Sequence, residues 1–323
     1  MKALVLNALH QALEYQDVPT PEPAKGEVLV HLHTAALNHR DFYITQGQYA
    51  GIKFPVIPGS DGAGEYEGKS VVIFPSLDWG KGPRAQSRAF RVLGMPDNGT
   101  FAEYIRIPKR NVYPKPEHLS WEQAAALPLG GLTAFRALFT RCQLKKGEKV
   151  LISGIGGGVA LFALQFAVAA GSEVFVTSGS TEKIEKAMRL GAKSGANYRT
   201  AGWDKQIKQE ADGFDVVIDS AAGDGFAALA GLCNPGARIG LYGGSLGKIN
   251  GLSPQIVFWK QISILGSTMG TDSDFQKMLT FVTKHNIIPV VDSVFPLADG
   301  NEALQRMGKG EQFGKIVLNI MPY

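Results

Sequence analysis

A glycine-rich segment holds the residue types that point most clearly to chemistry. Residues 154–160 read Gly-Ile-Gly-Gly-Gly-Val-Ala, directly after the apolar run 150–153 and before an uncharged stretch that starts at Leu161. A strand, a glycine turn and a helix in this order suit a pyrophosphate, because backbone without side chains lets the anion approach the amides at the helix N-terminus. A purely structural turn is the alternative. Four glycines in five positions and a second apolar run from Glu173 favour a dinucleotide site.

The end of that second run indicates which dinucleotide would bind. An NAD site usually carries Asp or Glu at this point to accept hydrogen bonds from the ribose hydroxyls, whereas residues 177–180 here read Thr-Ser-Gly-Ser. Small side chains such as those of Ser178 and Ser180 leave room for a 2′-phosphate. Lys183 follows one helical turn later, where its ammonium can pair with that phosphate, although a solvated surface lysine is the ordinary alternative. The sequence therefore predicts NADPH as the cofactor.

Composition and cysteine content exclude several other classes of protein. The 323 residues are 45% apolar and 19% charged, which suffices for two domains with cores of their own and excludes a disordered or collagen-like chain. A net charge of +4 is too small to argue for nucleic acid or an anionic membrane as a partner. Cys142 and Cys233 have no close companion, so neither a disulfide framework nor a cysteine metal cluster is expected. A cytoplasmic location fits this pattern, and the opening residues lack the long apolar run of a signal peptide.

The elements that must position the glycine turn change in character along the chain. The first 119 residues are rich in proline and carry short β-type runs, as in an irregular β domain. Ser120 is a predicted helix N-cap, and from Lys149 onward apolar strands alternate with helices, which predicts an α/β unit with a doubly wound parallel sheet. The uncharged residues 150–172 are interpreted as strand, turn and buried helix rather than a membrane span, because glycines interrupt them. The expected strands include residues 28–33, 71–74, 150–153, 173–177, 215–219, 238–242, 263–267, 287–291 and 315–319.

Together these features resemble the medium-chain dehydrogenase/reductase superfamily, and within it the zinc-free quinone oxidoreductase branch. The resemblance covers essentially the whole chain, and its motifs are specific through their order. It implies a GroES-like irregular β-barrel catalytic domain formed by residues 1–119 and 286–323, a Rossmann NADP-binding domain formed by residues 120–285, and a homodimer. The motifs that carry it are ALNHRD at 36–41, PGSDGAG at 58–64, GTFAEY at 99–104, AAALPLGGLTA at 124–134, the glycine turn, GA at 191–192 with NYR at 197–199, FDVVIDS at 214–220 and GKIV at 314–317.

The resemblance also implies that this chain has lost a metal. In zinc alcohol dehydrogenases of the superfamily, three side chains hold a catalytic zinc that polarises the substrate oxygen. This chain has Asn38, Ser60 and Leu129 at the corresponding positions, and residues 75–98 lack the four cysteines of a structural zinc lobe. No metal site is therefore expected. The histidines of this half are interpreted as surface or packing residues: His31, His33 and His39.

Carried over residue by residue, the resemblance implies a site. Asn38 and Tyr43 match contacts to the substrate and the nicotinamide, and Thr133 lies beside the nicotinamide, so these three are the expected catalytic residues. Tyr43 could donate a proton to a developing enolate, with a tyrosine satisfied in the core as the equal alternative. Lys183 and Tyr198 match a pair that holds the 2′-phosphate. The expected cofactor contacts are Gly156, Gly157, Gly158, Val159, Ala160, Ser178, Ser180, Lys183, Tyr198, Ser220, Tyr242, Gly243, Gly244 and Lys315.

The implied activity is the reduction of a quinone or an α,β-unsaturated carbonyl by NADPH. Hydride adds to a carbon conjugated with the carbonyl, and charge develops on an oxygen that a hydroxyl, an amide or water can hydrogen-bond and protonate. The alternatives are a zinc-independent alcohol dehydrogenase, an enoyl-thioester reductase, or a non-enzymatic nucleotide- or RNA-binding protein. Ile155 and Ala160 depart from the family's small-residue turn, and residues 79–96 form an insertion-like region without an assigned role.

Overall fold

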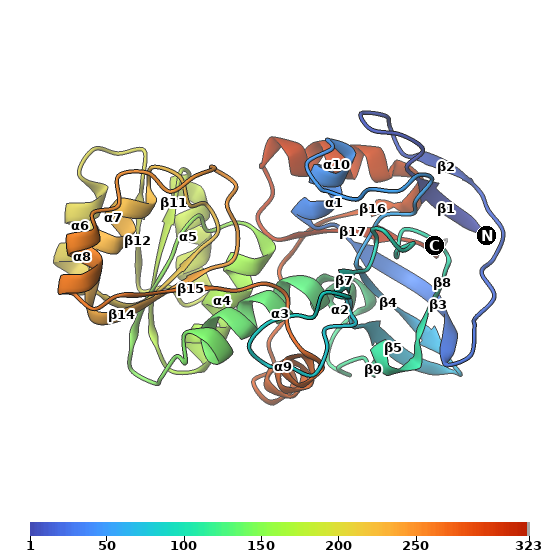
Figure 1. The fold of residues 1–323 in the computed structure, drawn as a ribbon, viewed down its shortest axis with the longest axis horizontal. Coiled ribbons are helices and arrows are strands. Elements are labelled where there is room, and N and C mark those ends of the chain that lie inside the picture. Colours follow the sequence, from blue (N-terminus) through green and yellow to red (C-terminus); the bar gives the residue numbers. More distant parts are fainter. Residues whose placement is uncertain (322–323) are drawn as a thin grey trace. The chain divides into compact units, whose positions relative to one another are not determined.

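The computed structural model describes residues 1–321, which form two compact units (Figure 1). The first unit comprises Met1–Leu132 with the chain from Gly270 onward, and the second comprises Thr133–Met269. These limits differ from the predicted domain boundaries at two places. Residues 120–132 and 270–285, which were expected in the Rossmann domain, pack with the first unit. Residues 322 and 323, the end of the predicted C-terminal segment, lie outside the described residues.

The first unit is built on a mostly antiparallel sheet around one long strand, β3 (Glu27–Ala36). Buried and partly exposed residues alternate along β3, with Val28, Val30 and Leu32 in the core, as expected for a strand covered on one face. The sheet order is β16-β17-β3-β4-β5-β9, and β8 also pairs with β3. The other strands of the sheet are β4 (Asp61–Tyr66), β5 (Lys69–Ile73), β8 (Tyr104–Pro108), β9 (Val112–Pro114), β16 (Val291–Pro296) and β17 (Lys315–Asn319).

Two helices of this unit begin at side-chain caps. The Ser120 hydroxyl accepts a hydrogen bond from the Gln123 amide and starts α2 (Trp121–Ala126), which confirms the predicted cap. Thr271 starts α9 (Asp272–Lys284) in the same way. The remaining elements of this unit are β1 (Lys2–Val5), β2 (Glu14–Asp17), β6 (Ser76–Leu77), β7 (Arg91–Val92), α1 (His39–Thr45), α10 (Gly300–Lys309) and the 3-10 turns Lys109–Asn111 and Leu297–Asp299. The helix α3 (Pro128–Phe135) follows α2 and begins in this unit, but its last residues and the π-helical turn after it (Arg136–Arg141) belong to the second unit.

The C-terminal segment contains one wrong prediction and one confirmed one. The expected strand at residues 287–291 is absent there, because the chain leaves α9 through a turn and β16 begins only at Val291. Pro289 explains the difference, since it has no amide hydrogen to give to a sheet ladder. The expected strand at residues 315–319 is confirmed as β17, which pairs with β3.

The second unit is a parallel six-stranded sheet in the order β12-β11-β10-β13-β14-β15. Val150, Leu151 and Ile152 of β10 are fully buried, which explains the continuous apolar runs of these strands. The chain runs outward from β10 through β11 to β12, then returns to β13 on the other side of β10, so the predicted doubly wound sheet is confirmed. Its strands and helices are β10 (Lys149–Ile152), β11 (Glu173–Ser178), β12 (Ser194–Asn197), β13 (Phe214–Asp219), β14 (Cys233–Leu241), β15 (Ser263–Gly266), α4 (Gly158–Ala169), α5 (Thr181–Arg189), α6 (Trp203–Ala211), α7 (Phe226–Gly231) and α8 (Pro254–Trp259).

The long uncharged segment folds as predicted. Residues 150–172 form most of β10, the glycine turn and α4, whose side chains Leu161, Phe162, Leu164 and Phe166 are buried. None of the helices within residues 1–321 has the length and apolar character needed to cross a membrane. The apolar composition of α4 is therefore explained by burial within the second unit.

Candidate functional site

The glycine turn joins β10 to α4 in a conformation that glycine adopts more easily than other residues. Gly154 has a φ of +63° and Gly156 a φ of +134°, and Gly157 is the N-cap of α4 without a side chain that caps the helix. A Cβ atom added at Gly154 or Gly157 would meet no atom within 4 Å. The open backbone and the uncapped amides at the start of α4 therefore suit an anion.

The two residues of this segment that depart from the family pattern, Ile155 and Ala160, pack into the protein and hold the turn in place. The Ile155 side chain is buried, and its amide donates to the Thr177 carbonyl at 2.8 Å, which ties the turn to the end of β11. Gly158, Val159 and Ala160 form the first turn of α4, and Ala160 is buried. Burial of Ile155 and Ala160 explains how the turn keeps an open face although both residues depart from the family pattern.

Three polar side chains lie near the point where the turn meets the end of β11. A Cβ atom at Gly156 would lie 2.9 Å from Cδ and 3.5 Å from Nζ of Lys183, so the lysine side chain lies beside that glycine. A Cβ atom at Gly179 would lie 2.9 Å from both Oη of Tyr198 and Nε of Arg199. The sequence predicts Lys183 and Tyr198 as contacts to the cofactor phosphate, but it does not predict Arg199. The one sequence signal for Arg199 is its position directly after Tyr198.

The two serines predicted as cofactor contacts have bonds within the protein. The Ser180 hydroxyl is the N-cap of α5 and accepts a hydrogen bond from the Lys183 amide at 3.4 Å. The Ser178 hydroxyl is buried and accepts from the Ser180 amide at 3.2 Å. These two bonds fix the start of α5 and so determine where Lys183 emerges.

Four other predicted cofactor residues follow the carboxyl ends of β13 and β14: Ser220, Tyr242, Gly243 and Gly244. The Tyr242 amide donates to the Asp219 carbonyl at 3.0 Å, and a Cβ atom at Gly243 would lie 2.8 Å from the Ser220 carbonyl oxygen, so a side chain there would collide with the backbone. Burial raises the pKa of Tyr242 to about 12. Gly244 follows in the same loop. The structure thus brings these residues and the glycine turn to one edge of the sheet, where doubly wound folds bind ligands.

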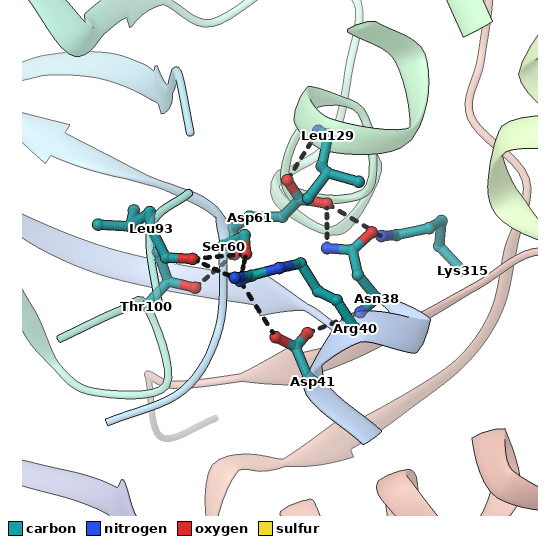
Figure 2. Close-up of polar contacts among 9 residues, drawn as sticks. All are labelled: Asn38, Arg40, Asp41, Ser60, Asp61, Leu93, Thr100, Leu129 and Lys315. Atoms are coloured by element: carbon teal, nitrogen blue, oxygen red, sulfur yellow. Dashed lines mark hydrogen bonds and ion pairs between the residues drawn. The ribbon is translucent and has the colours of Figure 1, made fainter. Parts of the chain in front are cut away.

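In the first unit, Asn38, Asp61 and Lys315 form a buried polar group, here called the Asn38 cluster (Figure 2). Lys315 Nζ donates to Asn38 Oδ1 at 2.6 Å and to Asp61 Oδ2 at 2.9 Å, and Asn38 Nδ2 donates to Asp61 Oδ2 at 2.9 Å. The Leu129 amide donates to Asp61 Oδ1 at 2.8 Å. Asp61 is fully buried, whereas Asn38 keeps 8% of its surface exposed. The sequence predicts Lys315 as a cofactor contact, and the structure gives its ammonium these two protein partners.

A second buried polar group lies next to the Asn38 cluster (Figure 2). Arg40 Nη1 donates to Ser60 Oγ and to the Leu93 carbonyl, both at 2.7 Å. Asp41 Oδ2 accepts from the Asn38 amide at 2.8 Å, whereas its Oδ1 has no hydrogen-bond partner within residues 1–321. Burial raises the pKa of Asp41 to about 6, although the nearby Arg40 charge opposes this rise. Arg40 and Asp41 belong to the ALNHRD motif, but the sequence predicts no role for either of them.

The residues at the superfamily's zinc positions gather around Asp61 but do not form a zinc site. Asn38 Oδ1 accepts from the Lys315 ammonium, Ser60 Oγ donates to the Leu93 carbonyl, and Leu129 has an aliphatic side chain. Zinc takes thiolate, imidazole or carboxylate ligands, and an ammonium 2.6 Å from one of the three groups would repel it. The donor set therefore does not fit a catalytic zinc.

Tyr43 and Thr133 are placed without a contact that assigns their chemistry. Tyr43 lies half-buried on α1 with its ring centroid 6.2 Å from that of His39, and Thr133 is a buried residue of α3. Their catalytic roles stay predictions. The histidines of β3 pack as predicted, with His31 stacked on Tyr104 at 4.6 Å between ring centroids.

Comparison with known proteins gives matches to two protein families and relatives that are similar over nearly the whole chain. Residues 24–117 match the family described as "Alcohol dehydrogenase GroES-like domain", and residues 158–284 match that described as "Zinc-binding dehydrogenase". The "Zinc-type alcohol dehydrogenase-like protein YogA" of Leptosphaeria maculans is 34% identical over 97% of this chain and 96% of its own length.

Solved structures resemble the whole chain as well. A crystal structure of an NAD-dependent alcohol dehydrogenase has a TM-score of 0.94 at 35% identity and covers 99% of this chain and 100% of its own. The quinone oxidoreductase from Thermus thermophilus, described with its NADPH complex, has a TM-score of 0.84 at 29% identity, with coverage of 99% and 100%. The similar proteins therefore include both alcohol dehydrogenases and a quinone oxidoreductase.

Proposed function

Because the chain belongs to the medium-chain dehydrogenase/reductase superfamily of oxidoreductases, we propose that it reduces quinones or α,β-unsaturated carbonyls with NADPH and without a catalytic metal. The observation that carries the proposal is the Asn38 cluster, in which Lys315 supplies a buried positive charge 2.6 Å from Asn38 Oδ1. Reduction of a conjugated carbonyl needs a hydrogen-bond donor for the oxygen on which charge develops, and an amide can serve.

The proposed reaction is balanced without a metal or a further redox partner. A bound NADPH would supply the hydride. That hydride would add to the substrate carbon β to the carbonyl, and the C=C π electrons would shift to form an enolate whose charge lies on the carbonyl oxygen. One proton at the α-carbon would complete the saturated carbonyl, whereas the adduct of a quinone would take one proton and tautomerise to the hydroquinone. NADPH would thereby lose two electrons and the substrate would gain them. Asn38, Tyr43 and Thr133 are proposed to contact the substrate and the nicotinamide.

The side chains near the end of β11 support the choice of NADPH over NADH. The end of β11 carries no carboxylate for the ribose hydroxyls, and Lys183, Tyr198 and Arg199 lie beside the glycines at that end. Two cations and a phenol can neutralise and hydrogen-bond a phosphate dianion. The 2′-phosphate is therefore proposed to bind among these three side chains, with the pyrophosphate at the glycine turn.

The proposal is tested by turnover of purified protein freed of metals with a chelator. NADPH oxidation is measured against 1,4-benzoquinone and trans-2-hexenal, next to alcohols with NAD⁺ or NADP⁺ and an enoyl thioester with NADPH. We expect oxidation of NADPH with a quinone or an alkenal. Turnover of alcohols alone, of the thioester alone, or of none of these compounds would contradict the proposal.

Assembly and location are proposed from the surface of the second unit and its thiols. β15 is the last strand of its sheet, with Ile264 39% exposed, and Trp259 at the end of α8 is 82% exposed. A second copy of the chain that continues the sheet at β15 would cover these apolar groups, so we propose a homodimer. Cys142 and Cys233 are free thiols, which supports a reducing compartment such as the cytoplasm.

A further inference from the structure

We infer that the buried Lys315–Asp61 ion pair orients the side-chain amide of Asn38, so that one Nδ2 hydrogen donates to the substrate oxygen on which charge develops. This inference rests on the proposed function and concerns how the same site works. Asn38 is the catalytic residue in it. Lys315 and Asp61 are positioning residues that act through Asn38.

Charge complementarity fixes which way the Asn38 amide faces. Its carbonyl oxygen meets the Lys315 ammonium at 2.6 Å, and its amino group meets an Asp61 carboxylate oxygen at 2.9 Å. Rotation of the amide by half a turn would set the amino group against the ammonium and the carbonyl against the carboxylate. Both contacts would then join like-signed atoms, because an ammonium only donates and a carboxylate only accepts. The cluster therefore permits one orientation.

One of the hydrogen-bond donors of Asn38 is not used within the described part of the protein. Its backbone amide donates to Asp41 Oδ2 and its backbone carbonyl accepts from the Asp41 amide, both at 2.8 Å. An amino group carries two hydrogens, and Asp61 takes one of them. The second Nδ2 hydrogen has no partner within residues 1–321, and Asn38 is the member of the cluster with most exposed surface, at 8%.

Lys315 also strengthens this donor. A hydrogen bond from a buried ammonium to the carbonyl end of an amide draws electron density away from its amino end. Asp61 is held in place in turn, because its Oδ1 accepts from the Leu129 amide and its carbonyl accepts from Thr100 Oγ1, both at 2.8 Å. A donor fixed in advance in a buried setting stabilises a developing oxyanion most effectively, because it does not need to reorganise.

The same bonds disfavour alcohols as substrates. Asp61 already accepts from Leu129, Asn38 and Lys315, so its carboxylate is not available as a base for an alcohol proton. The Asn38 cluster thus offers a donor and no base. This balance suits a ketone or aldehyde oxygen that gains charge and does not suit a hydroxyl that must lose a proton.

A double-mutant cycle on Asn38 and Lys315 tests the inference. Asn38→Ala, Lys315→Met and the double variant are compared for kcat, KM and the Kd of NADPH, with Lys315→Arg as the conservative replacement. Each single variant is expected to lose roughly 10- to 100-fold in kcat, which is a larger factor than any change in the Kd of NADPH. Because Lys315 acts through Asn38, the double variant should be no slower than Asn38→Ala, and Lys315→Arg should restore part of the rate. Losses that multiply, or a loss confined to NADPH affinity, would overturn the inference.

Lys115→Met is the matched control for loss of a partly buried lysine in the same unit. Lys115 Nζ donates to the Pro116 and Leu119 carbonyls, so its replacement also removes two ammonium bonds. It should leave kcat unchanged, and an equal loss of kcat in this variant would overturn the specific role of Lys315. If Lys315→Met does not fold, Lys315→Gln replaces it in the cycle, since glutamine keeps a neutral donor.

A second readout does not depend on turnover. In protein labelled with ¹⁵N-asparagine, the two Nδ2 hydrogens of Asn38 should give separate signals, and the hydrogen bonded to Asp61 should exchange slowly with solvent. Lys315→Met should speed this exchange, whereas Lys115→Met should not. Rapid exchange of both hydrogens in the wild-type protein would overturn the inference. An inactive wild-type enzyme with a protected Asn38 hydrogen would instead refute the proposed function and leave the orientation intact.

Discussion

Asp41 should make this protein less stable as the pH rises from 4 to 6. Burial raises the pKa of its carboxyl from 3.8 to about 6, and one of its oxygens has no hydrogen-bond partner within residues 1–321. Between these two pH values the unfolded chain releases the Asp41 proton while the folded protein keeps it. Increasing pH therefore favours the unfolded chain. The contribution of the Asp41 carboxyl to the free energy of unfolding is greatest below pH 3.8 and is lost as the pH passes 6.

The size of the effect follows from the pKa difference. A shift of about two pKa units corresponds to about 3 kcal/mol in the free energy of unfolding, at about 1.4 kcal/mol for each unit. Asp41→Asn removes the titration and retains an oxygen that can accept from the Asn38 amide. The difference in unfolding free energy, Asp41→Asn minus wild type, should rise by about 2.4 kcal/mol between pH 4 and pH 7, because the unfolded chain has already lost part of its Asp41 proton at pH 4. Any constant cost of the substitution cancels from this rise.

Urea unfolding followed by fluorescence at several pH values measures this difference directly. Asp17→Asn serves as the control, because Asp17 is exposed and its pair with Lys2 lowers the pKa of its carboxyl. That control should change the pH dependence in the opposite direction and only slightly, since exposed ion pairs contribute little. The reasoning would be refuted if the difference in unfolding free energy between wild type and Asp41→Asn stayed constant from pH 4 to pH 7.

Three further predictions concern the second unit. Lys183→Ala and Arg199→Ala should each weaken NADPH binding by about 1 to 3 kcal/mol and leave NADH nearly unchanged in fluorescence titrations. Lys186→Ala on the same helix, whose ammonium pairs with a carboxylate at 2.6 Å, is the control, and equal losses for both cofactors would contradict the 2′-phosphate assignment. Gly156→Ala should lower stability by about 1 to 3 kcal/mol in urea unfolding and weaken NADPH binding, because a φ of +134° strains a side chain whose Cβ would lie 2.9 Å from Lys183. An unchanged midpoint would refute this. Trp259→Asp should shift a dimer toward monomer in light scattering, and an unchanged mass would contradict the proposed interface.

The glycine turn and the central strands could be predicted from the sequence because their signals are local. Residues 150–169 combine an apolar run, four glycines and an uncharged helix, and each feature acts within a few residues of its neighbours. The same holds for the cap at Ser120. The strand expected at residues 287–291 failed for a local reason too, since Pro289 interrupts an otherwise apolar run.

The Asn38 cluster could not be predicted from the sequence, because its members meet only through the fold. Lys315 and Asp61 are 254 residues apart and belong to β17 and β4, which flank β3 on either side in the sheet. No local sequence pattern links the two residues, and the resemblance predicted Lys315 as a cofactor contact instead. The unit boundaries differ from the predicted ones for a similar reason, since Phe275 of α9 packs on Phe74, 201 positions earlier, with 4.9 Å between ring centroids.

Transfer of deuterium from NADPH labelled at C4 tests the central claim most directly. Chelator-treated protein is incubated with trans-2-hexenal and each of the two C4-deuterated NADPH stereoisomers, and the product is examined by mass spectrometry and NMR. We predict one deuterium on the β-carbon of the saturated aldehyde from one stereoisomer, at a rate that added zinc does not change. Deuterium at the carbonyl carbon, activity that appears only after zinc is added, or the absence of labelled product would contradict metal-free reduction of a conjugated double bond.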